Sequence, residues 1–179
     1  MITVISGTNR KDSRTLIIAK AFVEYARATG SEVQLLDLAS LDLNVFSADM
    51  YAAKGISPEL AALQEKYILG AEKLAFILPE YNGSYPGVLK FFIDAISVNE
   101  YARNFKGKVI SLTGVASGRA GNLRGMDHLS ASLSYMGGWI LPNKLPVSSV
   151  DGLLDDNNQL TDEGTINALK TQAEQLIAA

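Results

Sequence analysis

The chain has 179 residues, of which 47% are hydrophobic, and its formal net charge is −3. This length suits one domain with a sizeable core, and the dispersed Lys and Arg residues do not form the basic stripe that nucleic-acid binding needs. Because the sequence contains no cysteine and one histidine, disulfides, iron–sulfur clusters, thiol nucleophiles and a histidine-rich zinc site are excluded.

The N-terminal segment ITVIS, residues 2–6, is expected to form the first strand. The sequence ahead of it has no basic region or apolar segment of the kind that directs export, and no apolar run in the chain reaches membrane-spanning length. We therefore expect a cytoplasmic protein with no membrane partner.

The next segment, SGTNRKDSRT from Ser6 to Thr15, lies between this strand and the helix-like LIIAKAFVEYA. A helix N-terminus carries unsatisfied N–H groups and partial positive charge, so a loop leading into it suits a phosphate. Hydroxyl and guanidinium donors are available at Thr8, Arg10, Ser13, Arg14 and Thr15. The loop matches neither the P-loop nor the GxGxxG pattern. By itself it fits equally well a simpler alternative, in which Asp12 or Ser13 only caps the helix.

Alternating helices and strands are expected to follow this loop. A helix over residues 13–29 ends at Gly30, and EVQLLDL, residues 32–38, forms the second strand. After a long connection, Ser57-Pro58-Glu59 begins another helix, with a capping hydroxyl, a proline at the first position and an early negative charge. KLAFIL, residues 73–78, is typical of a fully buried third strand.

A second unusual loop, LPEYNGSYPGVLKFFIDAI, begins at Leu78, between the third strand and a helix over residues 88–97. Its backbone is made rigid and closely approachable by prolines and glycines, while tyrosines and an amide supply flat and polar surface: Pro79, Tyr81, Asn82, Gly83, Tyr85, Pro86 and Gly87. A planar heterocycle would fit against such a loop. Taken alone, however, the pattern favours an ordinary Pro/Gly turn.

The rest of the chain continues the alternation. GKVISLTGV, residues 107–115, forms the fourth strand, and residues 120–138 form a helix that Gly125 interrupts or delays. Prolines in WILPNKLPVSSV, residues 139–150, suit an edge or broken fifth strand. Thr161-Asp162-Glu163 caps a final amphipathic helix, whose apolar face consists of Ile166, Leu169, Ala173 and Leu176. Such alternation predicts parallel strands joined by right-handed crossovers, in one domain over residues 1–179.

Together, these loops resemble those of the NADPH-dependent FMN reductase family. Its first loop reads approximately GSxRxxSxT, and the chain matches it at Gly7, Arg10, Ser13 and Thr15, with Thr8 in place of serine. From Pro79 to Asp94 the second loop matches PEYNGSYPGVLKNxID almost letter for letter. TGVASGRAGNLRG, residues 113–125, resembles the family's small-residue loop after the fourth strand. The resemblance runs from the first strand to about Pro142, with departures at Phe91, at Phe92 and in LDLNVFSADMYAAKG, residues 41–55.

The resemblance implies a flavodoxin-like three-layer α/β sandwich, with a five-stranded parallel sheet in the order 2-1-3-4-5. At such a sheet, the loops after strands one, three and four converge on one crevice. It also implies an FMN-dependent NAD(P)H oxidoreductase, in which hydride passes from NADPH or NADH to flavin N5 and on to a flavin, quinone, azo or metal acceptor. The flavin carries the chemistry, so no side chain is expected to be catalytic and no metal is expected. The expected cofactor-binding residues are Thr8, Arg10, Ser13, Arg14, Thr15, Leu16, Pro79, Glu80, Tyr81, Asn82, Gly83, Ala116, Ser117, Gly118 and Arg119.

Two alternatives stay open at this point. One is a flavodoxin-type electron carrier that does not turn over NAD(P)H, and the other is a protein that kept the fold but lost the flavin. The family resemblance also implies a homodimer or homotetramer, for which Leu43 to Tyr51 and the helix after Tyr85 offer apolar and aromatic surface. NADPH is the expected co-substrate, although no motif identifies a partner for its 2′-phosphate.

Several single residues allow more than one interpretation. His128 lies in a helical pattern near Leu129, which favours a packing or surface role over proton transfer. Trp139 is expected in the core or at an interface. Glu80 is expected to shape the backbone or to bridge subunits, and Arg119 to face solvent, a partner subunit or the phosphate of the nicotinamide cofactor.

Overall fold

A parallel sheet forms the centre of the molecule. The computed structural model describes residues 1–42, 48–52 and 55–179, and its strands follow the order β2-β1-β3-β4-β5, with β6 also paired to β4. This confirms the order predicted from the sequence. The strands are β1 (Ile2–Ser6), β2 (Val33–Asp37), β3 (Lys73–Pro79), β4 (Val109–Val115), β5 (Trp139–Ile140) and β6 (Leu145–Val147).

The predicted fifth strand is broken into two short pieces on the same neighbour. Trp139 and Ile140 pair with the beginning of β4, and Leu145–Val147 pair with its end, both in parallel. Pro142 lies between the two pieces and has no backbone N–H to donate to the sheet. The break predicted from the prolines is therefore confirmed.

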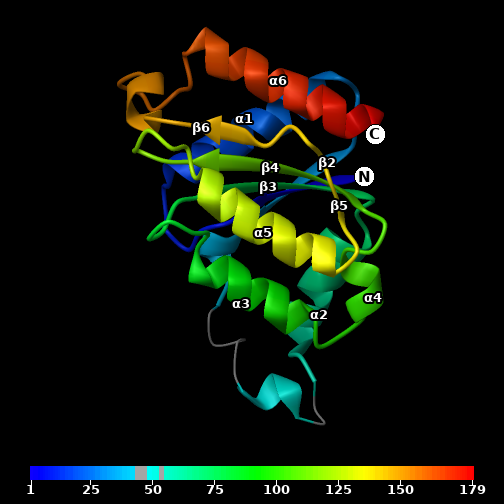
Figure 1. The fold of residues 1–179 in the computed structure, drawn as a ribbon. Coiled ribbons are helices and arrows are strands. Elements are labelled where there is room, and N and C mark those ends of the chain that lie inside the picture. The colour runs from blue at the N-terminus through cyan, green and yellow to red at the C-terminus, as the bar shows by residue number, and fades with distance from the viewer. Residues whose placement is uncertain (43–47, 53–54) are drawn as a thin grey trace.

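Helices cover both faces of the sheet and give three layers (Figure 1). Helices α1 and α6 lie on one face, and α2, α3 and α5 on the other. The α-helices are α1 (Arg14–Ala28), α2 (Pro58–Gln64), α3 (Gly87–Ile96), α4 (Tyr101–Asn104), α5 (Leu123–Tyr135) and α6 (Glu163–Ala178). Shorter helical segments are η1 (Leu38–Ser40), η3 (Ala48–Tyr51), η4 (Glu65–Leu69) and η5 (Val150–Leu153). Among the described residues, no helix is both long and apolar enough to cross a bilayer.

Local capping explains where three of these helices begin. The Ser13 hydroxyl accepts from the backbone N–H of Leu16 at 3.1 Å and the Ser57 hydroxyl from that of Leu60 at 3.2 Å. The Asp162 carboxylate accepts from the N–H of Thr165 at 2.7 Å. Each contact satisfies a donor that the first turn of a helix leaves without an intrahelical acceptor. The predicted starts of α1, α2 and α6 are confirmed by these caps.

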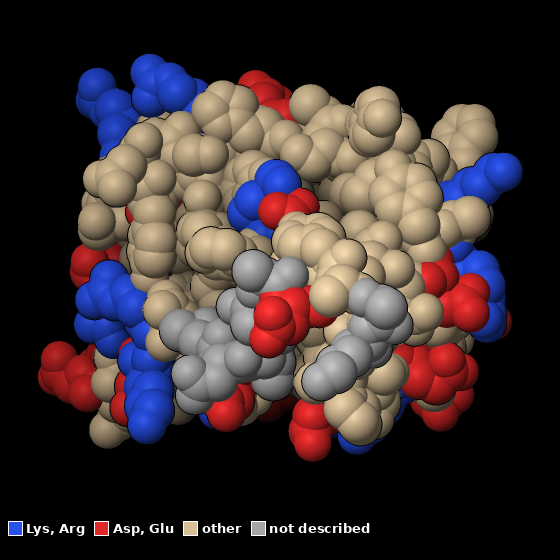
Figure 2. All heavy atoms as spheres, turned by 90° about the horizontal axis from the view of Figure 1, so that it is seen from below, with Lys and Arg blue, Asp and Glu red and all other residues tan. Residues whose placement is uncertain are grey.

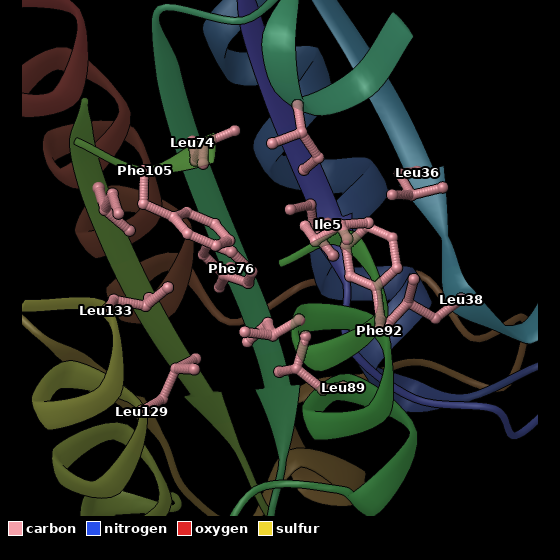
Figure 3. Packing of buried hydrophobic residues seen from close by; sticks show 14 of the residues in the cluster. Ile5, Leu36, Leu38, Leu74, Phe76, Leu89, Phe92, Phe105, Leu129 and Leu133 are labelled. Carbon is pink, nitrogen blue, oxygen red and sulfur yellow. The ribbon is translucent and has the colours of Figure 1, made fainter. Parts of the chain in front are cut away.

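Alternating side chains of the strands divide the core into two clusters. In β3, Phe76 faces the layer of α3 and α5, whereas its neighbour Ile77 faces α1 and α6, as the period of two in a strand requires. Figure 3 shows the first cluster, where Phe92 of α3 and Leu129 of α5 point toward the sheet. The second cluster includes Ile18, Phe22, Leu169 and Leu176. Helices thus cover both faces of the sheet. The loops at the carboxyl ends of the strands are the part of the sheet that stays accessible to a ligand.

Three expectations from the sequence need correction or restriction. Gly125 neither interrupts nor delays the fourth long helix, because α5 begins at Leu123 and runs through it. Trp139 does not belong to the core, since 69% of its surface is exposed on β5, the edge strand of the sheet. The aromatic stretch proposed as an oligomer contact lies partly outside the described residues, at positions 43–47.

Candidate functional site

Three loops meet where β1, β3 and β4 end. These strands are parallel neighbours, so their carboxyl ends lie at one edge of the sheet, at the left in Figure 1. A cavity of about 520 Å³ opens there, which lies within the size range of ligand sites. Its walls are formed by Thr8, Arg10, Lys11, Asp12, Ser13, Arg14, Thr15, Pro79, Glu80, Tyr81, Val115, Ala116, Ser117, Val150 and Asp151.

The first loop lies directly on β3. The backbone N–H of Gly7 donates to the carbonyl of Ile77 at 2.8 Å. A Cβ atom at Gly7 would come within 3.0 Å of Leu89 Cδ2 and 3.3 Å of the Ile77 carbonyl oxygen. The close approach therefore requires glycine, and it places the N-terminus of α1 and the buried Thr8 and Thr15 at the cavity.

The cationic residues of the cavity wall differ in how they are paired. Arg14 Nε lies 2.9 Å from Asp151 Oδ1, and its Nη1 donates to Asn158. Among the described residues, no carboxylate pairs with Arg10, whose backbone N–H donates to Thr8 Oγ1 at 3.2 Å. Arg10 is thus the guanidinium that is left available for an anionic ligand, next to a helix N-terminus that also attracts anions.

The second loop is joined to both of its neighbours. The hydroxyls of Tyr81 and Thr8 are 2.8 Å apart, so the second loop is hydrogen-bonded to the first. The backbone N–H of Glu80 donates to the carbonyl of Val115 at 3.1 Å, at the end of β4. These contacts place Pro79, Glu80 and Tyr81 in the wall of the cavity, between the phosphate-type loop and the loop after β4.

Asn122 holds the start of the second loop in place, and this role was not predicted from the sequence. Its buried Nδ2 donates to the carbonyls of Leu78 at 3.1 Å and Pro79 at 2.8 Å. Room for this side chain depends on glycines, because a Cβ at Gly125 would lie 2.1 Å from Asn122 Oδ1 and one at Gly114 2.9 Å from Asn122 Cβ. The glycines of the third motif are the signal that could have pointed to it.

The third loop is held through its backbone by the segment that includes β6. The N–H of Ala116 donates to the carbonyl of Val147 at 3.0 Å, and Val150 donates back to Ala116 at 3.1 Å. Ala116 and Ser117 accordingly line the cavity. Val150 and Asp151 line it as well, and the sequence did not predict them because their place depends on pairing across the sheet.

Ten of the fifteen predicted binding residues line the cavity, and the others lie around it. Leu16 uses its backbone N–H in the Ser13 cap. Asn82 and Gly83 form the tip of a turn, and Gly118 and Arg119 are exposed in the third loop. His128 Nδ1, on α5, lies 2.9 Å from the Ser84 hydroxyl, so the expected surface residue also contacts the second loop. In the described parts of the chain, no group of three or more His, Asp or Glu residues could hold a metal ion.

The donor set suits a ligand with a phosphate at one end and a planar polar ring at the other. Hydroxyls, a helix N-terminus and the Arg10 guanidinium gather at the first loop, and they match the negative charge and acceptor oxygens of a phosphate. Backbone groups of the second and third loops line the remaining wall. These features fit FMN, which has an anionic phosphate at one end and a planar, polar isoalloxazine ring at the other.

Comparison with known proteins agrees with this chemistry. The model of the family described as NADPH-dependent FMN reductase matches residues 1–151. An NAD(P)H-dependent FMN reductase of Pseudomonas aeruginosa is 31% identical over 150 residues, which cover 82% of this chain and 77% of that protein. A 2-hydroxy-1,4-benzoquinone reductase of Burkholderia is 28% identical, covering 99% of this chain and 94% of that protein.

A solved structure shows the same architecture. The flavoenzyme NAD(P)H:(acceptor) oxidoreductase FerB of Paracoccus denitrificans superposes with a TM-score of 0.75 at 25% identity, over 98% of this chain and 97% of that one. The similarity extends beyond residue 151, where the match of the family model ends, and includes the C-terminal segment that carries α6.

Proposed function

The chain belongs to the NADPH-dependent FMN reductase family, and from this premise we infer that it is an FMN-dependent NAD(P)H oxidoreductase. The observation that carries this function is the meeting of three loops at one cavity, where Arg10 lies beside the N-terminus of α1 and has no carboxylate partner among the described residues. We propose that residues 1–179 form a single FMN-binding domain around that cavity.

FMN, when bound, accepts hydride from the nicotinamide and delivers electrons to a second substrate. The protein supplies binding and orientation. We propose that the phosphate is bound by the first N–H groups of α1, by the Arg10 guanidinium and by the hydroxyls of Thr8, Ser13 and Thr15. Arg14 lies in the same wall, but two of its donors are engaged by Asp151 and Asn158.

The second and third loops orient the ring in this proposal. Their backbone groups, at Pro79–Gly83 and Ala116–Gly118, lie on two sides of the cavity or at its rim. Fixed N–H donors next to a ring that gains electrons stabilise the added negative charge without reorganisation. The N–H groups of Glu80, Tyr81 and Ala116 already donate within the protein, so the candidates for this role are those of Asn82, Gly83, Ser117 and Gly118. Glu80 contributes through the hydrogen bond of its backbone N–H to Val115. Hydride transfer to a flavin needs no side-chain acid or base, so none is assigned to the Glu80 carboxylate.

The electron acceptor is a small molecule. The relatives named above include a benzoquinone reductase, and others are FMN-dependent NADPH-azoreductases of Staphylococcus aureus. We propose a quinone, azo compound, free flavin or metal ion as acceptor and NADPH as the preferred reductant, with exposed Arg119 as a candidate partner for its 2′-phosphate. This reductant is a metabolite of the cytoplasm, where we expect the protein to work.

We further propose that the protein is a homodimer or a homotetramer. Exposed aromatic residues gather on and beside α3 and α5, namely Phe91, Tyr101, Tyr135 and Trp139. Figure 2 shows the molecule from the α3 side, where uncharged residues cover much of the face, a positive and a negative group lie together near its centre, and most other charged groups lie toward its margins. Such a surface suits an isologous contact. Light scattering at micromolar concentration is expected to give a dimer or tetramer, and a monomer would contradict the proposal.

Isothermal titration of the apoprotein with FMN and with riboflavin tests the proposed site. Tight binding of FMN and much weaker binding of riboflavin are expected, because riboflavin lacks the phosphate. Equal affinity for both would remove the first loop from the site, and binding of neither would favour a family member that has lost the flavin.

A further inference from the structure

The segment Tyr81–Ser84 is a tight two-residue hairpin. The backbones of Tyr81 and Ser84 donate to each other's carbonyls at 2.9 and 3.0 Å, and Asn82 and Gly83 have φ values of 53° and 77°. Positive φ at both central residues defines a type I′ turn, which Asn-Gly favours. Because the turn is closed by its own hydrogen bonds, its orientation against the cavity depends on what holds its two ends.

Each end of this turn is tied to a different part of the molecule. At the first end, the Tyr81 hydroxyl contacts Thr8 Oγ1 at 2.8 Å, in the phosphate-type loop. At the second end, the Ser84 hydroxyl contacts His128 Nδ1 at 2.9 Å, on α5. The chain before the turn is also held by the bonds of Glu80 to Val115 and of Asn122 to Pro79, so loss of the second tie would free the Ser84 end of the turn rather than the Tyr81 end.

The support behind the second tie is rigid. Helix α5 is anchored on the sheet by the buried side chains of Met126, Leu129 and Leu133. A serine hydroxyl both donates and accepts, so it can donate to a neutral ring nitrogen or accept from a protonated one. The contact between Ser84 and His128 therefore persists in either protonation state of the imidazole, as a structural tie should.

We propose that His128 is a positioning residue, which acts through Ser84 to fix the orientation of the Tyr81–Ser84 turn beside the cavity. The consequence for the flavin rests on the proposed function, in which this turn adjoins the isoalloxazine ring. Loss of the tie changes the surroundings of the ring and its reduction potential. It leaves the phosphate end largely unaffected, because Arg10 and the N-terminus of α1 lie on a different loop.

The experiment compares four variants with the wild type: His128→Leu, His128→Asn, Ser84→Ala and the double variant His128→Leu/Ser84→Ala. Asparagine places a polar amide atom near the position of Nδ1, so it can restore the hydrogen bond. In the apoprotein, NMR hydrogen exchange of the Tyr81 and Ser84 amides is measured. With FMN bound, the visible spectrum, the midpoint potential and the dissociation constant are measured. Ser134→Ala, an exposed change elsewhere on α5, is the matched control.

His128→Leu and Ser84→Ala are each expected to accelerate exchange of the two amides about two- to tenfold, the range for one net hydrogen bond. The double variant is expected to add nothing further, and His128→Asn and Ser134→Ala to behave like the wild type. With FMN bound, the two single variants should share the same shift of spectrum and potential, with less than a threefold change in dissociation constant.

Two results would overturn the proposal. One is wild-type exchange and spectrum in His128→Leu, and the other is a defect that His128→Asn does not restore, which would indicate packing rather than the hydrogen bond. Unchanged exchange of amides in β3 verifies that the fold is intact. If the wild type binds no FMN, the proposed function fails, but the exchange measurements on the apoprotein still decide the role of His128.

Discussion

The loop after β1 and the loop after β3 border the same cavity, yet they are held in different ways. The first lies on β3 through Gly7, and the guanidinium of Arg10 has no carboxylate partner among the residues that the structure describes. The second is tied to other elements through Tyr81, Ser84 and the carbonyls that Asn122 binds. A loop that binds an anion must keep donors free, whereas a loop that orients a ring must have its own backbone fixed.

The largest expected effect concerns the support of the second loop. In Gly114→Ala, the new Cβ would lie 2.2 Å from the carbonyl oxygen of Gly121 and 2.9 Å from Asn122 Cβ. Backbone atoms cannot yield cheaply, so we expect the free energy of unfolding to fall by about 3 kcal/mol, at the upper end of the cost of overpacking. Urea denaturation of the apoprotein measures it.

Gly118→Ala is the matched control for this change. Gly118 lies in the loop after the same strand, but no atom lies within 4 Å of a Cβ placed there, so its unfolding free energy should stay within about 0.5 kcal/mol of the wild type. Equal stability of the two variants would show that Asn122 is not confined as the structure indicates.

The next effect concerns Arg10 and tests the first loop independently of the second. Arg10→Ala should weaken FMN binding by about 1.5–3 kcal/mol, the range for hydrogen bonds to charged groups, while leaving the affinity for riboflavin unchanged. Isothermal titration gives both values, and Lys20→Ala, an exposed change on α1, is the control. Unchanged FMN affinity would remove Arg10 from the phosphate site.

A smaller effect is expected from the paired arginine of the same loop. Arg14→Gln leaves the Asp151 carboxylate in the cavity wall without its ion-pair partner. Because the side chains of Arg14 and Asp151 are 42% and 60% exposed, we expect FMN binding to weaken by at most about 1 kcal/mol, and Asp151→Asn in the Arg14→Gln background to restore it. Failure to restore it would indicate that Arg14 binds the phosphate directly, as the sequence predicts.

The smallest expected effect is a pH dependence of stability at Lys108, a residue that lies away from both loops. Lys108 Nζ donates to the carbonyls of Ile68 and Ala71, and burial, with a smaller contribution from Arg103, lowers the pKa of Lys108 below its usual 10.5. Between the lowered pKa and 10.5 the unfolded chain binds more protons than the folded one, so this residue's contribution to stability rises with pH. Thermal unfolding across that window should show the rise, and Lys108→Met should reduce it. The affinity for FMN should not change with pH in the same way. A parallel change would contradict the view that Lys108 acts apart from the two loops.

The contrast between the loops also explains what the sequence could predict. Caps such as Ser13 and Asp162 depend on neighbours within a turn, and the anion-type and Asn-Gly loops carry their own signals. The alternation predicted parallel strands, and the family resemblance implied their order. The ties of the second loop could not be predicted, because Asn122, just before α5, and His128, within α5, lie more than forty positions away from it in the sequence. Arg14 and Asp151 are 137 positions apart in the sequence. Their pairing could therefore not be predicted, and the guanidinium of Arg14 was expected to be available for the ligand.

Anaerobic reduction of the FMN-loaded protein tests the central claim most directly. Addition of NADPH should bleach the absorbance of the bound flavin, and a quinone, an azo dye or free FMN should then restore it, with ping-pong kinetics in the steady state. Bleaching by neither NADPH nor NADH, in a protein that binds FMN tightly, would contradict the reductase function and indicate an electron carrier instead.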